Sequence, residues 1–281
     1  MAGVVSKDIA RRYLLPIDVV QAHDEGILHY HDIDYAVNKE TNCCLVNLAD
    51  MLQNGTVING IKIEKPHRVI TASTITTQII LAVSSSQYGG TSITLTHLAP
   101  FVRDSYEKYY KKYKAWGFVD EKAKEFAKLD TKKEVEDAVQ TFNYQVNSMA
   151  NSNGQAPFIS VFMYLGETEE YKEELAMLIE EFLKQRILGL KNEVGVYITQ
   201  AFPKLLYVLE EDNIHEDSKY WYLTELAAKC TAKRMVPDYI SEKKMKEYKE
   251  GNCFPCMGCR SFLSPWKDEN GKYKFYGRLT A

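Results

Sequence analysis

The chain has 281 residues, of which 45% are hydrophobic and 26% charged, a globular mixture that argues against a disordered protein. Its formal net charge is −3 and its isoelectric point is about 6.1, so composition does not indicate nucleic acid or an anionic membrane as the main partner. Residues 1–12 have no apolar signal-peptide core, and no run of about 18 apolar residues occurs in the chain. We therefore expect a cytoplasmic protein that uses neither a membrane nor nucleic acid as a partner.

The N-terminal region predicts two short helices followed by an extended segment. Ser6 is of a type that caps helix N-termini, and residues 16–26 form a short helical stretch that ends in a glycine. Residues 29–35, which read His-Tyr-His-Asp-Ile-Asp-Tyr, are expected to be extended and to lead into a strand around Cys43.

The middle of the chain predicts helices that each bury one face. Residues 68–87 form a helix rich in Ile, Thr and Ser, with a packed side and a polar side. Residues 132–148 and 169–188 show the clearest helical periodicity. Two stripes at helical spacing are expected to pack: Tyr106, Tyr109, Tyr110 and Tyr113, and then Tyr171, Leu175, Leu178 and Phe182.

Runs of β-prone residues lie between and after these helices. Residues 157–165 and 204–209 predict two strands, and residues 273–276 predict a further one. Helices alternate with strands without internal repeats or a convincing linker. This order favours one α/β domain in which both faces of the sheet are largely covered.

The six cysteines are expected to be mostly reduced, because cytoplasmic proteins rarely use a disulfide framework. Cys230 lies on an apolar helical stripe and is expected to be a small buried hydrophobe. Cys43 and Cys44 are adjacent in a short apolar run, and successive side chains of a strand point to opposite faces. Only one of these two thiols can therefore face a given pocket.

Three further cysteines, Cys253, Cys256 and Cys259, recur at every third residue around a Pro and a Gly near the C-terminus. A zinc or iron–sulfur site here lacks an obvious fourth ligand, and His29 and His31 without a third partner make a weak metal site. A Cys-x-x-Cys redox motif is expected at the start of a helix after a strand, near the other end of the chain. Spacing alone leaves metal binding, thiol chemistry and unreactive loop cysteines open.

Residues 257–266, which read Met-Gly-Cys-Arg-Ser-Phe-Leu-Ser-Pro-Trp, resemble the active-site cysteine loop of the anaerobic, class III ribonucleoside-triphosphate reductases. Further stretches resemble the family in its own order: residues 5–16, residues 22–34, Asn42-Cys43 with Leu45, and residues 88–91. Together they span nearly the whole chain. The resemblance implies a glycyl radical enzyme with a ten-stranded α/β barrel, of which this chain would form an incomplete barrel.

The resemblance also implies the roles of the cysteines. In the family, a buried glycyl radical oxidises the loop cysteine, which maps onto Cys259, and the resulting thiyl radical removes the 3′ hydrogen of the substrate ribose. The second family cysteine maps onto Cys43 and delivers hydrogen at C2′ after water leaves, with formate as the usual reductant. Cys44 would then be a packing residue. Cys253 and Cys256 are not needed for the formate route and could be incidental or mark a variant reduced by protein thiols.

The expected substrate-binding residues are Met257 and Ser261 in the cysteine loop together with Gly89, Gly90 and Thr91. The last three follow a serine-rich stretch whose hydroxyls, backbone N–H groups and glycines suit a phosphate, although the same stretch fits a helix C-cap and a turn. In the family, ATP or deoxynucleotide effectors bind at a dimer interface, and the candidates here are Glu64, His67, Gln78 and Lys111.

The family's glycyl radical and four-cysteine zinc sites lie farther downstream, and its ATP-cone would precede this chain. We therefore expect residues 1–281 to form one partial catalytic barrel domain, roughly the N-terminal half, with no metal of its own. A missing C-terminal half would supply the glycyl radical and the zinc, a radical-SAM activase would generate the radical, and the chain alone would be an inactive part of a homodimer. The alternatives are an inactive nucleotide-binding fragment that dimerises, or a cysteine-rich metal or redox protein.

Overall fold

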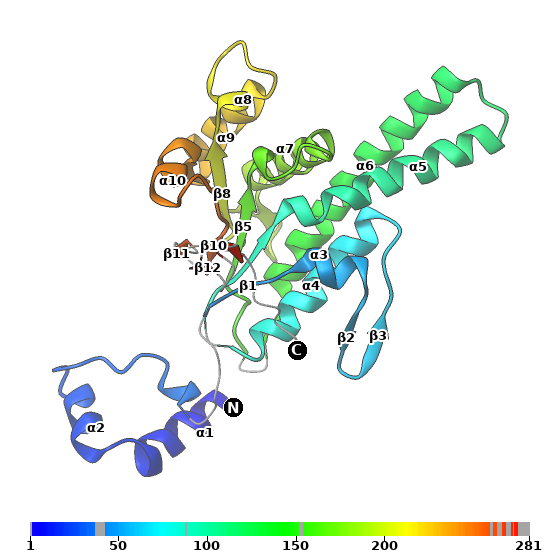
Figure 1. Cartoon of the computed structure of the whole chain (residues 1–281). Helices are drawn as coiled ribbons and strands as arrows, with labels where there is room; N and C mark the ends of the chain where they lie inside the picture. Colours follow the sequence, from blue (N-terminus) through cyan, green and yellow to red (C-terminus); the bar gives the residue numbers. More distant parts are fainter. Residues whose placement is uncertain are drawn as a thin grey trace.

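The computed structural model describes residues 2–36, 43–87, 89–151, 154–258, 261–262, 266–267, 271 and 273–274. Its centre is a five-stranded parallel sheet flanked by helices (Figure 1). Across the sheet the strands are β1 (Cys44–Leu45), β4 (Thr91–Thr94), β5 (Ile159–Met163), β8 (Lys204–Leu209) and β9 (Asp238–Ser241). The predicted α/β fold is confirmed, and a parallel sheet of this size is consistent with an incomplete α/β barrel.

Long helices connect these strands, as parallel pairing requires. They are α4 (Val69–Ser84), α5 (Ala99–Ala115), α6 (Asp120–Ser148), α7 (Lys172–Leu188) and α9 (Trp221–Arg234). The predicted helices at residues 68–87, 132–148 and 169–188 are confirmed, although α6 starts earlier than its clearest periodicity. Within the described residues, no helix is both long and apolar enough to cross a membrane.

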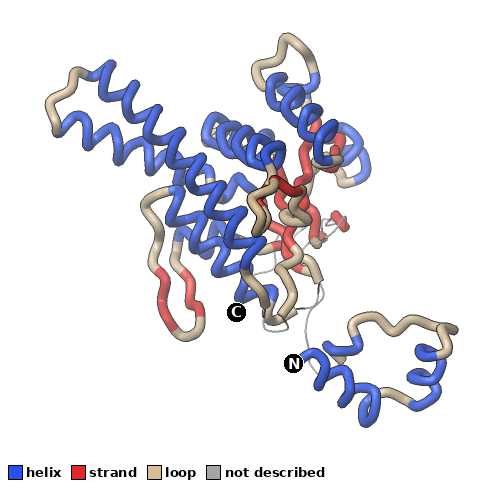
Figure 2. The backbone as a smooth tube through the Cα atoms, turned by 180° about the vertical axis from the view of Figure 1, so that it is seen from behind, coloured by secondary structure: helices blue, strands red, loops and turns tan. Residues whose placement is uncertain are grey.

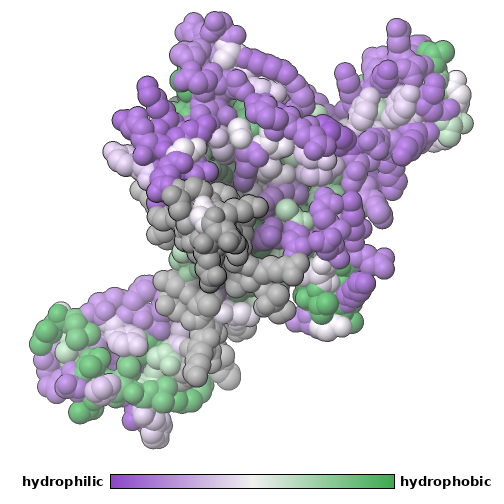
Figure 3. Space-filling model, viewed as in Figure 1, coloured by the Kyte–Doolittle hydropathy of each residue, from purple (hydrophilic) through white to green (hydrophobic). Residues whose placement is uncertain are grey.

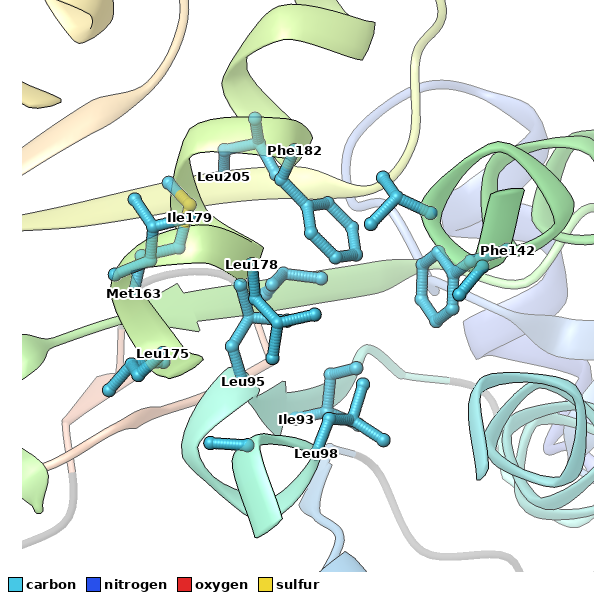
Figure 4. Packing of buried hydrophobic residues seen from close by; sticks show 14 of the residues in the cluster. Ile93, Leu95, Leu98, Phe142, Met163, Leu175, Leu178, Ile179, Phe182 and Leu205 are labelled. Carbon is cyan, nitrogen blue, oxygen red and sulfur yellow. The ribbon is translucent and has the colours of Figure 1, made fainter. Parts of the chain in front are cut away.

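The main core lies between one face of the sheet and the helices (Figure 4). Met163 of β5 and Leu205 of β8 pack there with Leu178 and Phe182 of α7, and the ring of Phe182 meets that of Phe142 edge to face at 5.4 Å. All five side chains are at most 2% exposed. Burying each of them stabilises the fold by roughly 1.5–3 kcal/mol, so this face anchors the sheet.

The opposite face of the sheet holds a second, smaller core. Phe162 of β5 and Leu206 of β8 alternate with the helix-facing residues, and they pack against Cys256, which is fully buried. Cys256 belongs to β10 (Cys256–Met257), which pairs antiparallel with β11 (Ser261–Phe262). The C-terminal cysteine segment therefore covers the sheet face that the helices leave free.

Shorter elements extend from this body. They are the helices α3 (Leu48–Gln53), α8 (Glu211–Ile214) and α10 (Glu242–Tyr248), the 3-10 turns η3 (Leu95–His97) and η4 (Leu165–Glu167), and the hairpins β2 (Thr56–Ile58) with β3 (Ile61–Ile63), β6 (Leu190–Lys191) with β7 (Tyr197–Ile198), and β12 (Trp266–Lys267) with β13 (Tyr273–Lys274). The strand predicted at residues 273–276 is confirmed for Tyr273 and Lys274, and residues 275–276 lie outside the described residues.

The N-terminal segment, residues 2–36, lies apart from the body in two opposite views (Figures 1 and 2). It contains α1 (Ala2–Ile9), a π-helical turn η1 (Ala10–Leu14), α2 (Ile17–Asp24) and a 3-10 turn η2 (Ile33–Tyr35). Its surface is rich in apolar side chains (Figure 3), and the most exposed are Val4, Tyr13, Ile17 and Ile27.

Two predictions for this segment are wrong. The first helix already begins at Ala2, so Ser6 lies inside it and does not cap it. Residues 29–35 are not extended, because the Tyr30 amide donates to His23 Nδ1 at 3.2 Å and Asp32 adopts a left-handed backbone with φ 52°. These local interactions bend the chain into turns before η2.

Candidate functional site

The adjacent thiols Cys43 and Cys44 lie on opposite faces of the sheet. Cys44 is 5% exposed in the helix-side core, where burial raises the pKa of its thiol to about 11. Its role as a packing residue is confirmed. Cys43, one residue earlier, is half-buried on the other face, where its Sγ accepts a hydrogen bond from the Gly90 amide at 3.3 Å.

Three chain segments meet closely at Cys43. A Cβ placed on Gly258 would lie 2.4 Å from Cys43 Sγ, and a Cβ placed on Gly90 would lie 2.9 Å from Gly258 Cα. Such distances exclude a side chain at either glycine unless its neighbours move. The glycines therefore let the C-terminal loop and the turn before β4 approach the Cys43 thiol.

Two serines on neighbouring strands bind the peptide groups of Gly258. Ser92 Oγ of β4 accepts a hydrogen bond from the Gly258 amide at 2.9 Å and lies 3.3 Å from the Gly258 carbonyl oxygen. Ser160 Oγ of β5 donates to the same oxygen at 2.8 Å. Both serines are fully buried, and we call the pair the loop seat. Because Ser92 and Ser160 are register partners in the sheet, both hydroxyls reach one point of the loop.

The residues predicted in the cysteine loop are placed only in part. Met257 is half-buried in β10, and its register partner is Ser261, of which the structure describes only the backbone in β11. Cys259 lies outside the described residues. Gly258 is the described residue that precedes Cys259, so its position shows where the cysteine loop meets the sheet.

The turn at Gly89, Gly90 and Thr91 continues from the end of α4. Gln87 Nε2 donates to the Gly89 carbonyl at 3.2 Å and to Thr91 Oγ1 at 2.6 Å. The Thr91 side chain is fully buried, and its register partners are Cys44 and Ile159 on the helix side. The Thr91 hydroxyl thus lies on the face opposite Cys43, and of this turn Gly90 is the residue that reaches the Cys43 thiol.

Lys204 is a residue of this face that sequence reasoning missed. It is the register partner of Ser160 at the start of β8, and its Nζ lies 4.8 Å from the centroid of the Phe158 ring. A Cβ on Gly90 would lie 2.4 Å from that same ring, so Lys204 is close to the Gly90 turn. Across the described ranges, no carboxylate forms an ion pair with Lys204.

The four effector candidates are exposed but do not line one pocket. Gln78 of α4 lines a pocket of about 1030 Å³ between α4 and the β2–β3 hairpin, and the lining of this pocket does not include the other three. Glu64 and His67 lie in the loop between β3 and α4, and Lys111 of α5 pairs with Glu107 at 3.9 Å.

The other cysteines are buried or half-buried. Cys230 is fully buried in the main core, as predicted. Burial, with a contribution from Glu242, raises the pKa of Cys253 to about 12, so this thiol is protonated at neutral pH. The five described cysteines form no disulfide, and within the described ranges no group of three His, Cys, Asp or Glu residues is arranged to hold a metal.

Known proteins resemble this chain over nearly its full length. The model of the family "Anaerobic ribonucleoside-triphosphate reductase" matches residues 1–280. Enzymes of that name from Enterobacteria phage T4 and Escherichia coli are each 40% identical over 99% of this chain, which spans 45% and 38% of their respective lengths.

Solved structures show the same fold. An anaerobic ribonucleotide reductase from Thermotoga maritima, in complex with dATP and CTP, matches with a TM-score of 0.54 at 14% identity, covering 85% of this chain and 41% of that one. A second anaerobic ribonucleotide reductase matches with a TM-score of 0.56 at 13% identity, over 98% of this chain and 41% of its own. The chain belongs to the family of anaerobic ribonucleoside-triphosphate reductases.

Proposed function

We propose that this chain is the cysteine-bearing part of a cytoplasmic enzyme that reduces ribonucleoside triphosphates to 2′-deoxyribonucleoside triphosphates. The observation that carries the proposal is the close approach of Gly258 to Cys43 on one face of the sheet. Residues distant in sequence meet there, and the next residue after Gly258 is the cysteine that matches the family's radical-bearing loop.

The proposed reaction divides the chemistry between two sulfurs. A thiyl radical on Cys259 removes the 3′ hydrogen of the ribose and later returns it. Cys43 donates a hydrogen at C2′ as the 2′-hydroxyl leaves as water. Formate then returns a hydrogen atom to the resulting Cys43 thiyl radical, its second electron reduces the 3′-ketone of the nucleotide together with a proton from solvent, and it leaves as carbon dioxide. The buried, hydrogen-bonded surroundings of Gly258 would fix where the Cys259 backbone begins, which suits a reaction that depends on close positioning.

We assign the binding of the nucleotide phosphates to Lys204 and to the backbone of the turn at Gly89 and Gly90. Lys204 has a charge complementary to phosphate and lies on the face that holds Cys43 and Ser160. Met257 and Ser261 would contact the nucleoside. The Thr91 hydroxyl lies on the other face, so we assign to Thr91 only a backbone role.

Regulation and activation complete the proposal. The Thermotoga maritima enzyme binds dATP and CTP, which supports nucleotides as substrates and effectors in this family. Glu64, His67, Gln78 and Lys111 remain our candidates for effector contacts at a homodimer interface. A downstream polypeptide would carry the glycyl radical and the zinc site, and a radical-SAM activase would generate the radical.

Anaerobic reconstitution tests this function. The chain is mixed with the complementary C-terminal polypeptide and its activase, and deoxynucleotide is measured with and without formate while electron paramagnetic resonance monitors the glycyl radical. We expect formate-dependent product, lost in Cys43→Ala and kept in Cys44→Ala, which changes the neighbouring thiol on the other face. A confirmed glycyl radical without product would instead indicate an inactive nucleotide-binding fragment.

A further inference from the structure

We propose that Ser92 and Ser160 are positioning residues for the reacting cysteine, and that Cys256 supports them as a structural thiol. The inference rests on the proposed function, because it assigns the loop seat a purpose in the radical step. The Gly258 carbonyl carbon is bonded to the nitrogen of Cys259. Holding that carbonyl therefore fixes the point from which Cys259 extends.

The two buried hydroxyls of the loop seat lower the stability of the protein unless they form hydrogen bonds with the loop. A buried hydroxyl loses its hydrogen bonds to water, and an unpaired one destabilises the protein. Apolar residues fill other positions on this face of β5 and β8, such as Phe162 and Leu206, and these need no partner. Ser92 and Ser160 instead direct their hydroxyls at Gly258, a residue distant in sequence.

The two serines hold different parts of the loop. Ser92 accepts from the Gly258 amide, which belongs to the peptide bond with Met257, and lies near the Gly258 carbonyl, which belongs to the peptide bond with Cys259. Among the contacts of the described residues, Ser160 binds only the Gly258 carbonyl. Removing Ser92 should consequently free the Gly258 amide and leave its carbonyl to Ser160, whereas removing Ser160 should weaken only the hold on the carbonyl.

Cys256 completes this arrangement from within the loop itself. Its Sγ lies 3.7 Å from Ser92 Oγ and 3.6 Å from the Gly258 carbonyl oxygen, within the range of hydrogen bonds to sulfur. The residue is fully buried against Phe162 and Leu206. These contacts assign Cys256 to holding the loop and not to binding metal or exchanging disulfides.

The first measurement uses the 281-residue chain alone. Hydrogen exchange at the Gly258 amide reports whether the loop is seated, because that amide donates to Ser92 Oγ. We expect protection to fall about tenfold or more in Ser92→Ala and about fivefold in Ser160→Ala, given the usual worth of one or two hydrogen bonds. The control is Ser73→Ala, which removes a buried hydroxyl that donates to the Ala138 carbonyl at 3.0 Å, between α4 and α6.

The second measurement uses the reconstituted complex. Misplacing the reacting group should lower kcat by about tenfold to a hundredfold in Ser92→Ala, with KM for the nucleotide unchanged and the glycyl radical intact. Ser92→Thr keeps the hydroxyl and should recover part of the lost kcat. Ser73→Ala should match the wild type, so a general loss of stability does not explain the result.

The outcomes separate this inference from the proposed function. Unchanged Gly258 exchange in both seat variants, or unchanged kcat in an active complex, would overturn the positioning role. If the wild-type complex forms no product, the proposed function fails, and the purpose assigned to the loop seat fails with it. Faster Gly258 exchange in that case would still establish the seat as a structural contact.

Discussion

Position 258 requires glycine for two reasons, its backbone conformation and the lack of space for a side chain. Its φ of 74° lies in the left-handed region, which glycine enters at little cost, and a Cβ would collide with the Cys43 side chain. Most other positive-φ glycines of the described chain meet only the first constraint. At Gly195, for example, φ is 80° and a Cβ would meet no atom within 4 Å.

This contrast predicts different costs for the same substitution. Gly195→Ala should lower the free energy of unfolding by about 1 kcal/mol, because alanine is strained at positive φ. Gly258→Ala should lower it by roughly 2–4 kcal/mol, because the clash with Cys43 adds to that strain. Urea unfolding measures both values, and equal losses would show that the Gly258 loop does not press against Cys43.

Lys204 gives a prediction about substrate affinity. If its ammonium binds a phosphate, Lys204→Met should raise KM for the nucleotide about tenfold or more in the reconstituted complex, because a charge-assisted hydrogen bond is lost. The matched control is Lys191→Met, whose Nζ lies 5.2 Å from the Tyr197 ring in the β6–β7 hairpin. A KM that changes equally in the two variants would contradict the assignment.

Sequence patterns predicted the placement of Cys43 and Cys44 but not that of the residues around them. The opposite placement of Cys43 and Cys44 follows from the alternation of a strand, and it was predicted without a structure. Ser92, Ser160 and Lys204 become neighbours only through strand register, which distant segments determine together. A local signal was the run Thr91-Ser92-Ile93-Thr94, in which hydroxyl residues flank an Ile.

At the scale of elements, the end of β8 is joined to the start of α8 by Glu210. Its carboxylate accepts a hydrogen bond from the Leu165 amide at 2.9 Å and forms a capping box with Asn213. Glu210 is 6% exposed, and burial, with a contribution from Glu242, raises its pKa to about 7. The folded protein therefore keeps a proton that the unfolded chain releases near its ordinary pKa of 4.5.

The sign of the pH dependence follows from this difference. The contribution of Glu210 to the free energy of unfolding is on the order of 3 kcal/mol. It is fully present below pH 4.5, declines as pH rises, and is lost above pH 7. In the Glu210→Gln variant the side chain cannot ionise. The free energy of unfolding of this variant should therefore fall less than that of the wild type between pH 5 and 8. Glu211→Gln, at an exposed neighbouring site, should follow the wild type, and parallel curves for all three proteins would refute this account.

Long elements were predictable because their patterns repeat over several turns. The stripe of α7 at Leu175, Leu178 and Phe182 packs into the core as its spacing indicated. Residues 29–35 were predicted incorrectly because a single hydrogen bond from Tyr30 and the left-handed Asp32 outweigh a weak local preference. Short segments depend on such individual contacts, which a pattern does not reveal.

At the scale of the whole molecule, the described chain leaves much surface that larger assemblies would cover. Among the described residues the sheet ends at β1 and β9, and the N-terminal segment has an apolar surface (Figure 3). Its Val4 and Ile17 side chains are 75% and 78% exposed. Unpaired strand edges and exposed apolar side chains favour association with other polypeptide segments. The chain also spans less than half the length of the curated relatives it matches. These surfaces support the proposal that the chain acts together with further parts of the enzyme.

The most direct test of the central claim is a cysteine substitution in the reconstituted complex. Cys259→Ser should leave the glycyl radical signal intact and abolish both deoxynucleotide formation and formate oxidation. Cys253→Ser, in the same segment, should retain turnover because its half-buried thiol has no proposed part in the reaction. Turnover by Cys259→Ser at the wild-type rate would contradict the claim that this loop supplies the radical-bearing thiol.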